Sequence, residues 1–131
     1  MGKQYAIVVD LALVVVFAVI GRASHGGSLG PGAIFGTAWP FLTACLVAWA
    51  VMLIRKRDHL GIGAGIFVWF ITWAGGMFFR VSGGDTAAIP FVVVAAAVLA
   101  LFLVGWRVLA GLLARRNGAA AKTAAGSVAD Q

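Results

Sequence analysis

The chain contains no glutamate, and only four aspartates stand against ten lysines and arginines. Charged residues make up 11% of the sequence, whereas a soluble domain carries about 25%. Water could not solvate such a surface, because 63% of the residues are hydrophobic. The scarcity of charge therefore excludes an ordinary soluble domain.

Residues that bind metals and cofactors are also scarce. Cys45 is the only cysteine, so no intramolecular disulfide can form, and we expect it to be a small buried hydrophobic residue. No cysteine pair, His-x-x-x-His motif or carboxylate cluster offers a metal cage. The glycines of residues 61–65 do not fit the dinucleotide-binding pattern. We therefore expect no cofactor, no metal and no enzymatic activity.

What the sequence has in abundance is long apolar stretches. They span about residues 5–21, 33–54, 60–79 and 86–113, and contain only two formal charges. Each can cross a bilayer, which takes about 20 apolar residues at about 1.5 Å per residue. The sequence predicts an all-α polytopic membrane protein, with a four-helix transmembrane domain in residues 1–113. Residues 114–131, rich in Ala, Gly and Ser, are predicted to be a disordered cytoplasmic tail.

The basic residues lie at the ends of the apolar stretches and predict the topology. If the chain starts in the cytoplasm, seven of them lie inside and only Arg22 and Arg80 lie outside. The positive-inside rule then places both termini in the cytoplasm, at the cell inner membrane. The excess of positive charge thus indicates topology and a lipid bilayer as partner, not nucleic acid. His25 and His59 fall on opposite faces, which disfavours a shared haem or metal site.

Two segments resemble one another and predict a tandem repeat of two helical hairpins. Arg22–Ser24 follows the first stretch and Arg80–Ser82 follows the third. Each is followed in turn by a Pro-Phe element that is predicted to mark a helix beginning. Chance similarity is the alternative, because membrane helices draw on few residue types. The remaining matched elements are Pro40–Phe41 with Pro90–Phe91 and, after a gap of seven residues, Leu46–Trp49 with Leu103–Trp106.

Asp10 is the first candidate for a functional residue. An aspartate at the centre of a membrane helix costs about 2.5–3.5 kcal/mol on insertion scales, so it should face protein or water, pair, or become protonated. The depth of Arg107 in the fourth stretch matches that of Asp10, and we predict that the two pair. Such a pair would be a proton or cation site, or a structural element. Alternatively, the fourth span ends at Trp106 and Arg107 reaches the inner headgroups.

A second polar group is predicted on the outer face. Arg22, Ser24 and His25 bring together a fixed cation, a hydroxyl and an imidazole, and the parallel segment adds Arg80. Such a group could bind an anion or pass a proton. In the alternative interpretation, Arg22 and His25 only cap helix carbonyls and contact lipid phosphates.

Several of these elements occur together in a known family. They are Asp10, Phe17, Gly21-Arg22-x-Ser24-His25, Trp39-Pro40-Phe41, Gly75-Gly76 with Arg80, and Gly105-Trp106-Arg107. In their order and spacing, residues 8–112 resemble the uncharacterised prokaryotic membrane family catalogued as domain of unknown function 3054. The resemblance implies a small integral membrane protein and transfers no activity, ligand or catalytic residue.

These observations lead to two expectations about function. The first is a small permeation or transport module for a small solute or ion, with Asp10 and Arg107 as its inner charged element and Arg22 and His25 as its outer one. Such a module could form a homodimer, because 131 residues give few helices to enclose a path. The second is a non-catalytic accessory or assembly subunit, whose faces of small residues dock against another membrane protein.

Overall fold

The computed structural model is built from helices alone in the residues that it describes, which are 3–24, 27, 29–56, 58, 60–85 and 87–129. Four helical stretches are long and apolar enough to cross a membrane, and the fourth runs from Ile89 to Gly118. The prediction of an all-α protein with four transmembrane helices is confirmed. The helices are α1 (Lys3–Ser24), α2 (Pro31–Ile54), α3 (Ile62–Ser82), α4 (Ile89–Leu103) and α5 (Gly105–Ala129).

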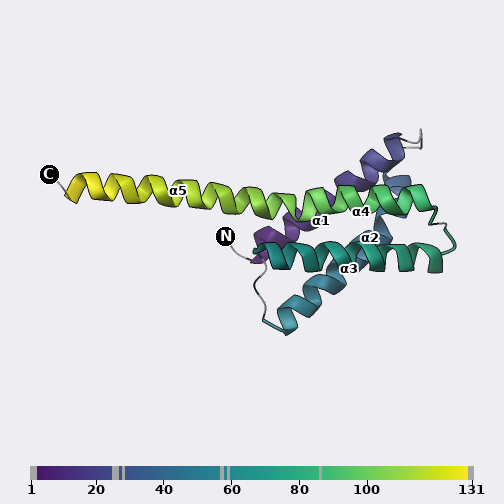
Figure 1. Cartoon of the computed structure of the whole chain (residues 1–131). Helices are drawn as coiled ribbons and strands as arrows, with labels where there is room; N and C mark the ends of the chain where they lie inside the picture. Colours follow the sequence, from purple (N-terminus) through teal and green to yellow (C-terminus); the bar gives the residue numbers. More distant parts are fainter. Residues whose placement is uncertain are drawn as a thin grey trace.

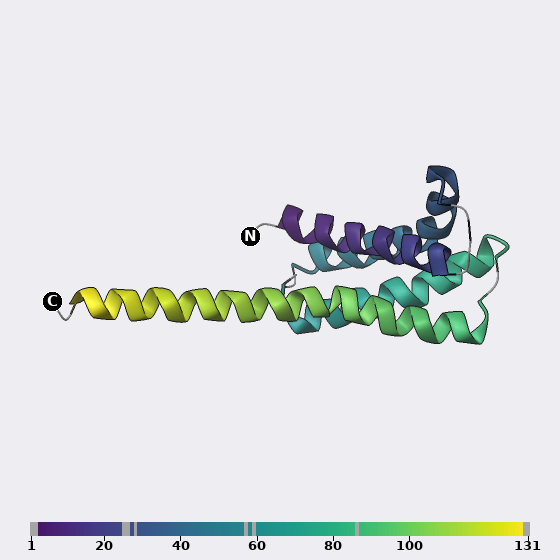
Figure 2. The ribbon, with the colours of Figure 1, turned by 90° about the horizontal axis from the view of Figure 1, so that it is seen from above.

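Helices α1 to α4 form a bundle in which each helix packs against two others. α2 packs against α1 and α3, and α4 packs against α3 and α1. The α1–α2 and α3–α4 connections lie at one end of the bundle, while α1 begins and α5 leaves at the other end (Figures 1 and 2). We call these the outer and the inner end, after the predicted topology.

α5 continues the line of α4 and projects beyond the bundle (Figure 1). Helical hydrogen bonds continue across the junction of α4 and α5. The Val104 amide donates to the Ala100 carbonyl, and the Val108 amide donates to the Val104 carbonyl, both at 3.0 Å. The helix runs on to Ala129, so residues 114–129 differ from the predicted disordered tail. The prediction of disorder rested on the lack of an apolar period in this segment. Alanine, however, has the highest helix propensity, so an alanine-rich segment continues a helix that is already formed.

Proline has two different roles in these helices. Pro90 occupies the first turn of α4, as predicted, and Pro31 does so in α2. This position suits proline because its fixed φ is helical and its missing N–H needs no partner there. Pro40 lies inside α2, so the prediction that it marks a helix beginning is wrong. The helix passes through it because membrane helices tolerate proline where neighbouring helices surround it.

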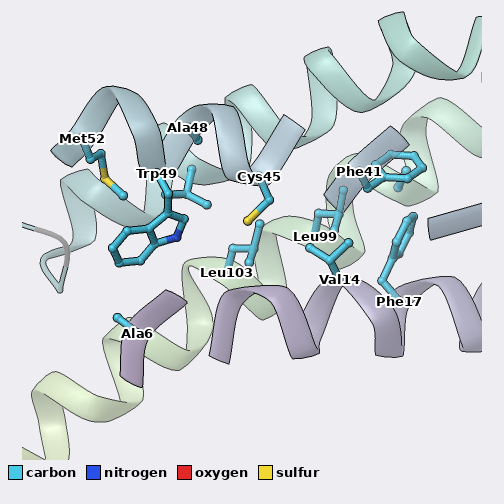
Figure 3. Packing of buried hydrophobic residues seen from close by; sticks show 12 residues of the cluster. Ala6, Val14, Phe17, Phe41, Cys45, Ala48, Trp49, Met52, Leu99 and Leu103 are labelled. Carbon is cyan, nitrogen blue, oxygen red and sulfur yellow. The ribbon is translucent and has the colours of Figure 1, made fainter. Parts of the chain in front are cut away.

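The core of the bundle contains an aromatic cluster towards the outer end. Phe17 of α1 and Phe41 of α2 meet edge to face, with ring centroids 5.1 Å apart, and Figure 3 shows the two rings next to each other. Phe91 of α4 completes the cluster, 6.3 Å from Phe41. A Cβ added to Gly76 of α3 would overlap the Phe41 ring. The absence of a side chain at Gly76 therefore lets α3 approach α2 closely.

Candidate functional site

The only two formal charges of the apolar stretches meet inside the bundle. The Arg107 guanidinium donates to both carboxylate oxygens of Asp10, with Nη1–Oδ1 and Nη2–Oδ2 distances of 2.8 Å. Neither side chain is exposed at all. This bidentate arrangement is the strongest geometry that an arginine and a carboxylate can adopt. Arg107 therefore points into the bundle and away from the inner headgroups.

Two tryptophans complete the surroundings of Asp10. The Trp49 indole donates to Oδ2 and the Trp106 indole to Oδ1, each at 2.8 Å. A carboxylate has about four acceptor positions, and these bonds with those from Arg107 use all of them. The Arg107 guanidinium also donates to the Leu103 carbonyl at 2.9 Å. We call Asp10, Trp49, Trp106 and Arg107 the charge clasp.

All five helices contribute to the charge clasp, α4 through the Leu103 carbonyl that accepts from Arg107. Asp10 comes from α1, Trp49 from α2, and Trp106 and Arg107 from the first turn of α5. α3 contributes a glycine, because a Cβ on Gly65 would lie 2.9 Å from Arg107 Cδ and 3.2 Å from the Val104 Cα. Such contacts are too short, so only glycine lets α3 come this close to the α4–α5 junction.

The tryptophans of the charge clasp were not predicted as site residues. The signal was present in the repeat, because Trp49 and Trp106 occupy matched positions in the two hairpins. An indole N–H in apolar surroundings needs an acceptor, and a carboxylate without water needs donors. Pairing these two indole donors with the single intramembrane carboxylate would have predicted that Trp49 and Trp106 contact Asp10.

A second cluster of charges surrounds a cavity of about 320 Å³ at the outer end. Arg22, in the last turn of α1, donates from Nη1 to the Thr37 hydroxyl of α2 at 3.0 Å. Arg80, in the last turn of α3, lies 3.4 Å from an Asp85 oxygen, and its guanidinium lies 4.4 Å from the centre of the Phe91 ring. All five residues line the cavity, which we call the outer cavity.

The two arginines of the outer cavity have closely similar backbone surroundings. The Gly27 amide donates to the Arg22 carbonyl at 2.8 Å, and the Asp85 amide donates to the Arg80 carbonyl at 3.0 Å. Each bond joins residues five apart, as in the helix-ending Schellman motif. This likeness agrees with the predicted repeat of hairpins.

The structure thus brings Arg22 and Arg80 to one cavity. The Arg22 guanidinium donates a hydrogen bond to the Thr37 hydroxyl, and the Arg22 carbonyl accepts one from a backbone amide. Capping of helix carbonyls is therefore not the only role of the Arg22 side chain. Of the other predicted outer residues, the Ser24 side chain and His25 lie outside the described residues. Thr37 was not predicted, although a Thr-Ala pair precedes the Pro-Phe element in both hairpins, at residues 37–38 and 86–87.

A comparison with protein families identifies the chain. The family described as Protein of unknown function (DUF3054) matches residues 7–110, which is most of the sequence. The chain belongs to this family. The DUF3054 match contains the whole charge clasp and every residue named at the outer cavity, but not the end of α5. Searches of curated proteins and of solved structures found no match.

Proposed function

We propose that the protein is a small permeation or transport module of the cell inner membrane, whose solute binds first as an anion in the outer cavity. The observation that carries this proposal is the meeting of Arg22 and Arg80 with the Thr37 hydroxyl around one cavity of about 320 Å³. Among the described lining residues, two guanidinium groups stand against the single carboxylate of Asp85, so an anion is favoured.

The form of the bundle supports a passage that is closed at its centre. The outer cavity ends at the aromatic cluster, since Phe17 and Phe91 line it. A second cavity of about 240 Å³ lies at the inner end, lined by Met52, Asp58 and Phe67 among others. The aromatic cluster bounds the outer cavity, and the charge clasp packs on Gly65, next to Ala64, which lines the inner cavity. A solute that crosses would require these layers to separate, in the manner of a gated transporter.

The charge clasp contributes to this proposal as a closure, not as a carrier of protons or cations. All acceptor positions of Asp10 are used, and no side-chain surface of Asp10 or Arg107 is accessible. A proton or cation could bind Asp10 only after one of these bonds broke. This favours the structural interpretation of the pair over an ion-binding one.

Anion flux into liposomes that contain the purified protein tests the proposal. The probes are chloride, acetate and inorganic phosphate, and we expect flux of at least one above that of protein-free liposomes. Arg22→Gln and Arg80→Gln should each lower this flux about tenfold or more, the loss of one charge-assisted hydrogen bond. Arg116→Gln is the matched control, because Arg116 is exposed on α5 far from the cavity. Absence of flux for all three probes would contradict transport of small anions.

The proposed orientation places both termini in the cytoplasm. Exposed basic residues at the inner end, Arg55, Lys56, Arg115 and Arg116, support it. Reporter fusions test it: a fluorescent protein at either terminus should fluoresce, and a periplasmic phosphatase at either terminus should be inactive. Active phosphatase would reverse the orientation and place the outer cavity in the cytoplasm.

A second candidate function is an accessory subunit, and one feature of α2 favours it. Gly32 and Gly36 are four residues apart, and a Cβ on either would meet nothing within 4 Å in the described part of the chain. Two such glycines form the face on which membrane helices dock closely. Stoichiometric co-purification with another membrane protein, lost in Gly36→Leu and retained in Gly111→Leu, would support this role.

A further inference from the structure

An apolar groove adjoins the outer cavity. It has a volume of about 260 Å³ and lies between α1 and α4, where Ile20, Val94 and Val98 line it. Phe17, Gly21 and Phe91 line both this groove and the outer cavity. We call it the lateral groove, because it lies between two helices of the bundle and not at its end.

The two hollows differ in chemistry. The outer cavity carries the guanidinium groups of Arg22 and Arg80, whereas every residue that lines the lateral groove is apolar. Ile20 is 46% exposed and Val94 is 58% exposed, so the groove is open on the outside of the bundle. In a bilayer this outside is hydrocarbon. A charged recess thus joins an apolar channel that faces lipid chains.

We propose that the outer cavity and the lateral groove together bind one anionic membrane lipid, with its phosphate group between Arg22 and Arg80 and one acyl chain in the groove. This inference rests on the proposed function and names the class of solute. The planar fork of arginine matches phosphate, and apolar chain surface gains by packing against apolar walls. A small free anion would fill only the cavity.

Gly21 lies where the two hollows join. A Cβ at this position would meet no atom within 4 Å in the described structure, so the space beside it is open. A larger side chain here would fill the junction without displacing the core. Gly21→Leu therefore separates the headgroup site from the chain site while both remain intact.

Photolabelling of the full chain in phosphatidylcholine vesicles tests the inference. The probe is a trace of phosphatidic acid with a photoactivatable acyl chain, and peptide mapping locates the label. We expect labelling at residues 94–98 of α4, reduced about tenfold or more in Arg22→Gln and Arg80→Gln. Val94→Trp and Gly21→Leu should reduce it similarly. Val93→Trp is the matched control, since Val93 is 61% exposed on the same helix and does not line the groove.

The outcomes separate this inference from the proposed function. Equal labelling by a photoactivatable phosphatidylcholine, or equal loss in Val93→Trp and Val94→Trp, would overturn the lipid site. In that case, a flux of inorganic phosphate that is lost in Arg22→Gln and unchanged in Val94→Trp would identify the free anion as the solute. The proposed transport function would then still hold. Selective labelling at residues 94–98 without flux of any small anion would support the lipid site and contradict transport of small anions.

Discussion

The charge clasp and the outer cavity both bring arginine close to aspartate, yet they differ in packing and in exposure. In the charge clasp the carboxylate is buried and accepts four hydrogen bonds of 2.8 Å. At the outer cavity Arg80 lies 3.4 Å from Asp85, whose side chain is 55% exposed, beside about 320 Å³ of open space. The buried ion pair holds helices together, whereas the pair at the outer cavity lies beside space that a ligand can enter.

The largest effect should follow removal of one charge from the clasp. Asp10→Asn or Arg107→Met alone should lower the free energy of unfolding by about 3–5 kcal/mol, because an unpaired buried group is left behind. Asp10→Asn combined with Arg107→Met leaves no unpaired charge and keeps an amide oxygen as acceptor for an indole, so it should be closer to the parent protein. Thermal unfolding in detergent measures this, with labelling of the buried Cys45 thiol as the signal. A double variant as unstable as the single ones would show that charge compensation is not the role of the pair.

Removing one indole donor should have the next largest effect. Trp49→Phe and Trp106→Phe each delete one hydrogen bond to a charged carboxylate, a loss of about 1.5–3 kcal/mol. Trp73→Phe is the control: its indole donates to the neutral Val92 carbonyl, and its loss should cost about 0.5–1.5 kcal/mol. The same unfolding measurement ranks the three. Equal losses would mean that the charge of Asp10 adds nothing to these bonds.

The close approach of α3 to the clasp can be tested with a methyl group. Gly65→Ala should destabilise the protein by about 1–3 kcal/mol, since its Cβ would lie 2.9 Å from Arg107 Cδ. Gly63→Ala on the same helix meets nothing within 4 Å in the described structure and should cause no loss. Comparable stability of the two variants would indicate that α3 can move away from Arg107 at no cost.

The smallest effect on stability is expected at the outer cavity. Asp85→Asn removes a carboxylate that is 55% exposed from its ion pair with Arg80, and should change the free energy of unfolding by less than about 1 kcal/mol. Anion binding should become about two- to fivefold tighter, because the only carboxylate among the described lining residues is gone. Titration with inorganic phosphate, followed by tryptophan fluorescence, measures this. Weaker binding would show that Asp85 positions Arg80 for the ligand.

The sequence predicted the helices well because bilayer thickness leaves little freedom. About 20 apolar residues must be helical, so the four spans, Asp10 and Arg107 could be found by counting. Pro40 was misjudged because the neighbours that let a helix pass through proline are not visible in a sequence. The same limit applies to the outer cavity, since Thr37 joins Arg22 only once α1 and α2 are packed. Contacts between spans depend on rotation about each helix axis, which a broad apolar pattern does not specify.

The separation of Asp10 and Arg107 along the chain has a consequence for biosynthesis. The two residues are 97 positions apart, with the carboxylate on α1 and its cation at the start of α5. At about 5–20 residues per second, translation leaves the aspartate without its arginine for about 5–20 s. During that interval an unpaired carboxylate on α1 favours contact with water or with other polar groups over hydrocarbon. Synthesis of α5 then supplies the cation that lets α1 bury its aspartate within the bundle.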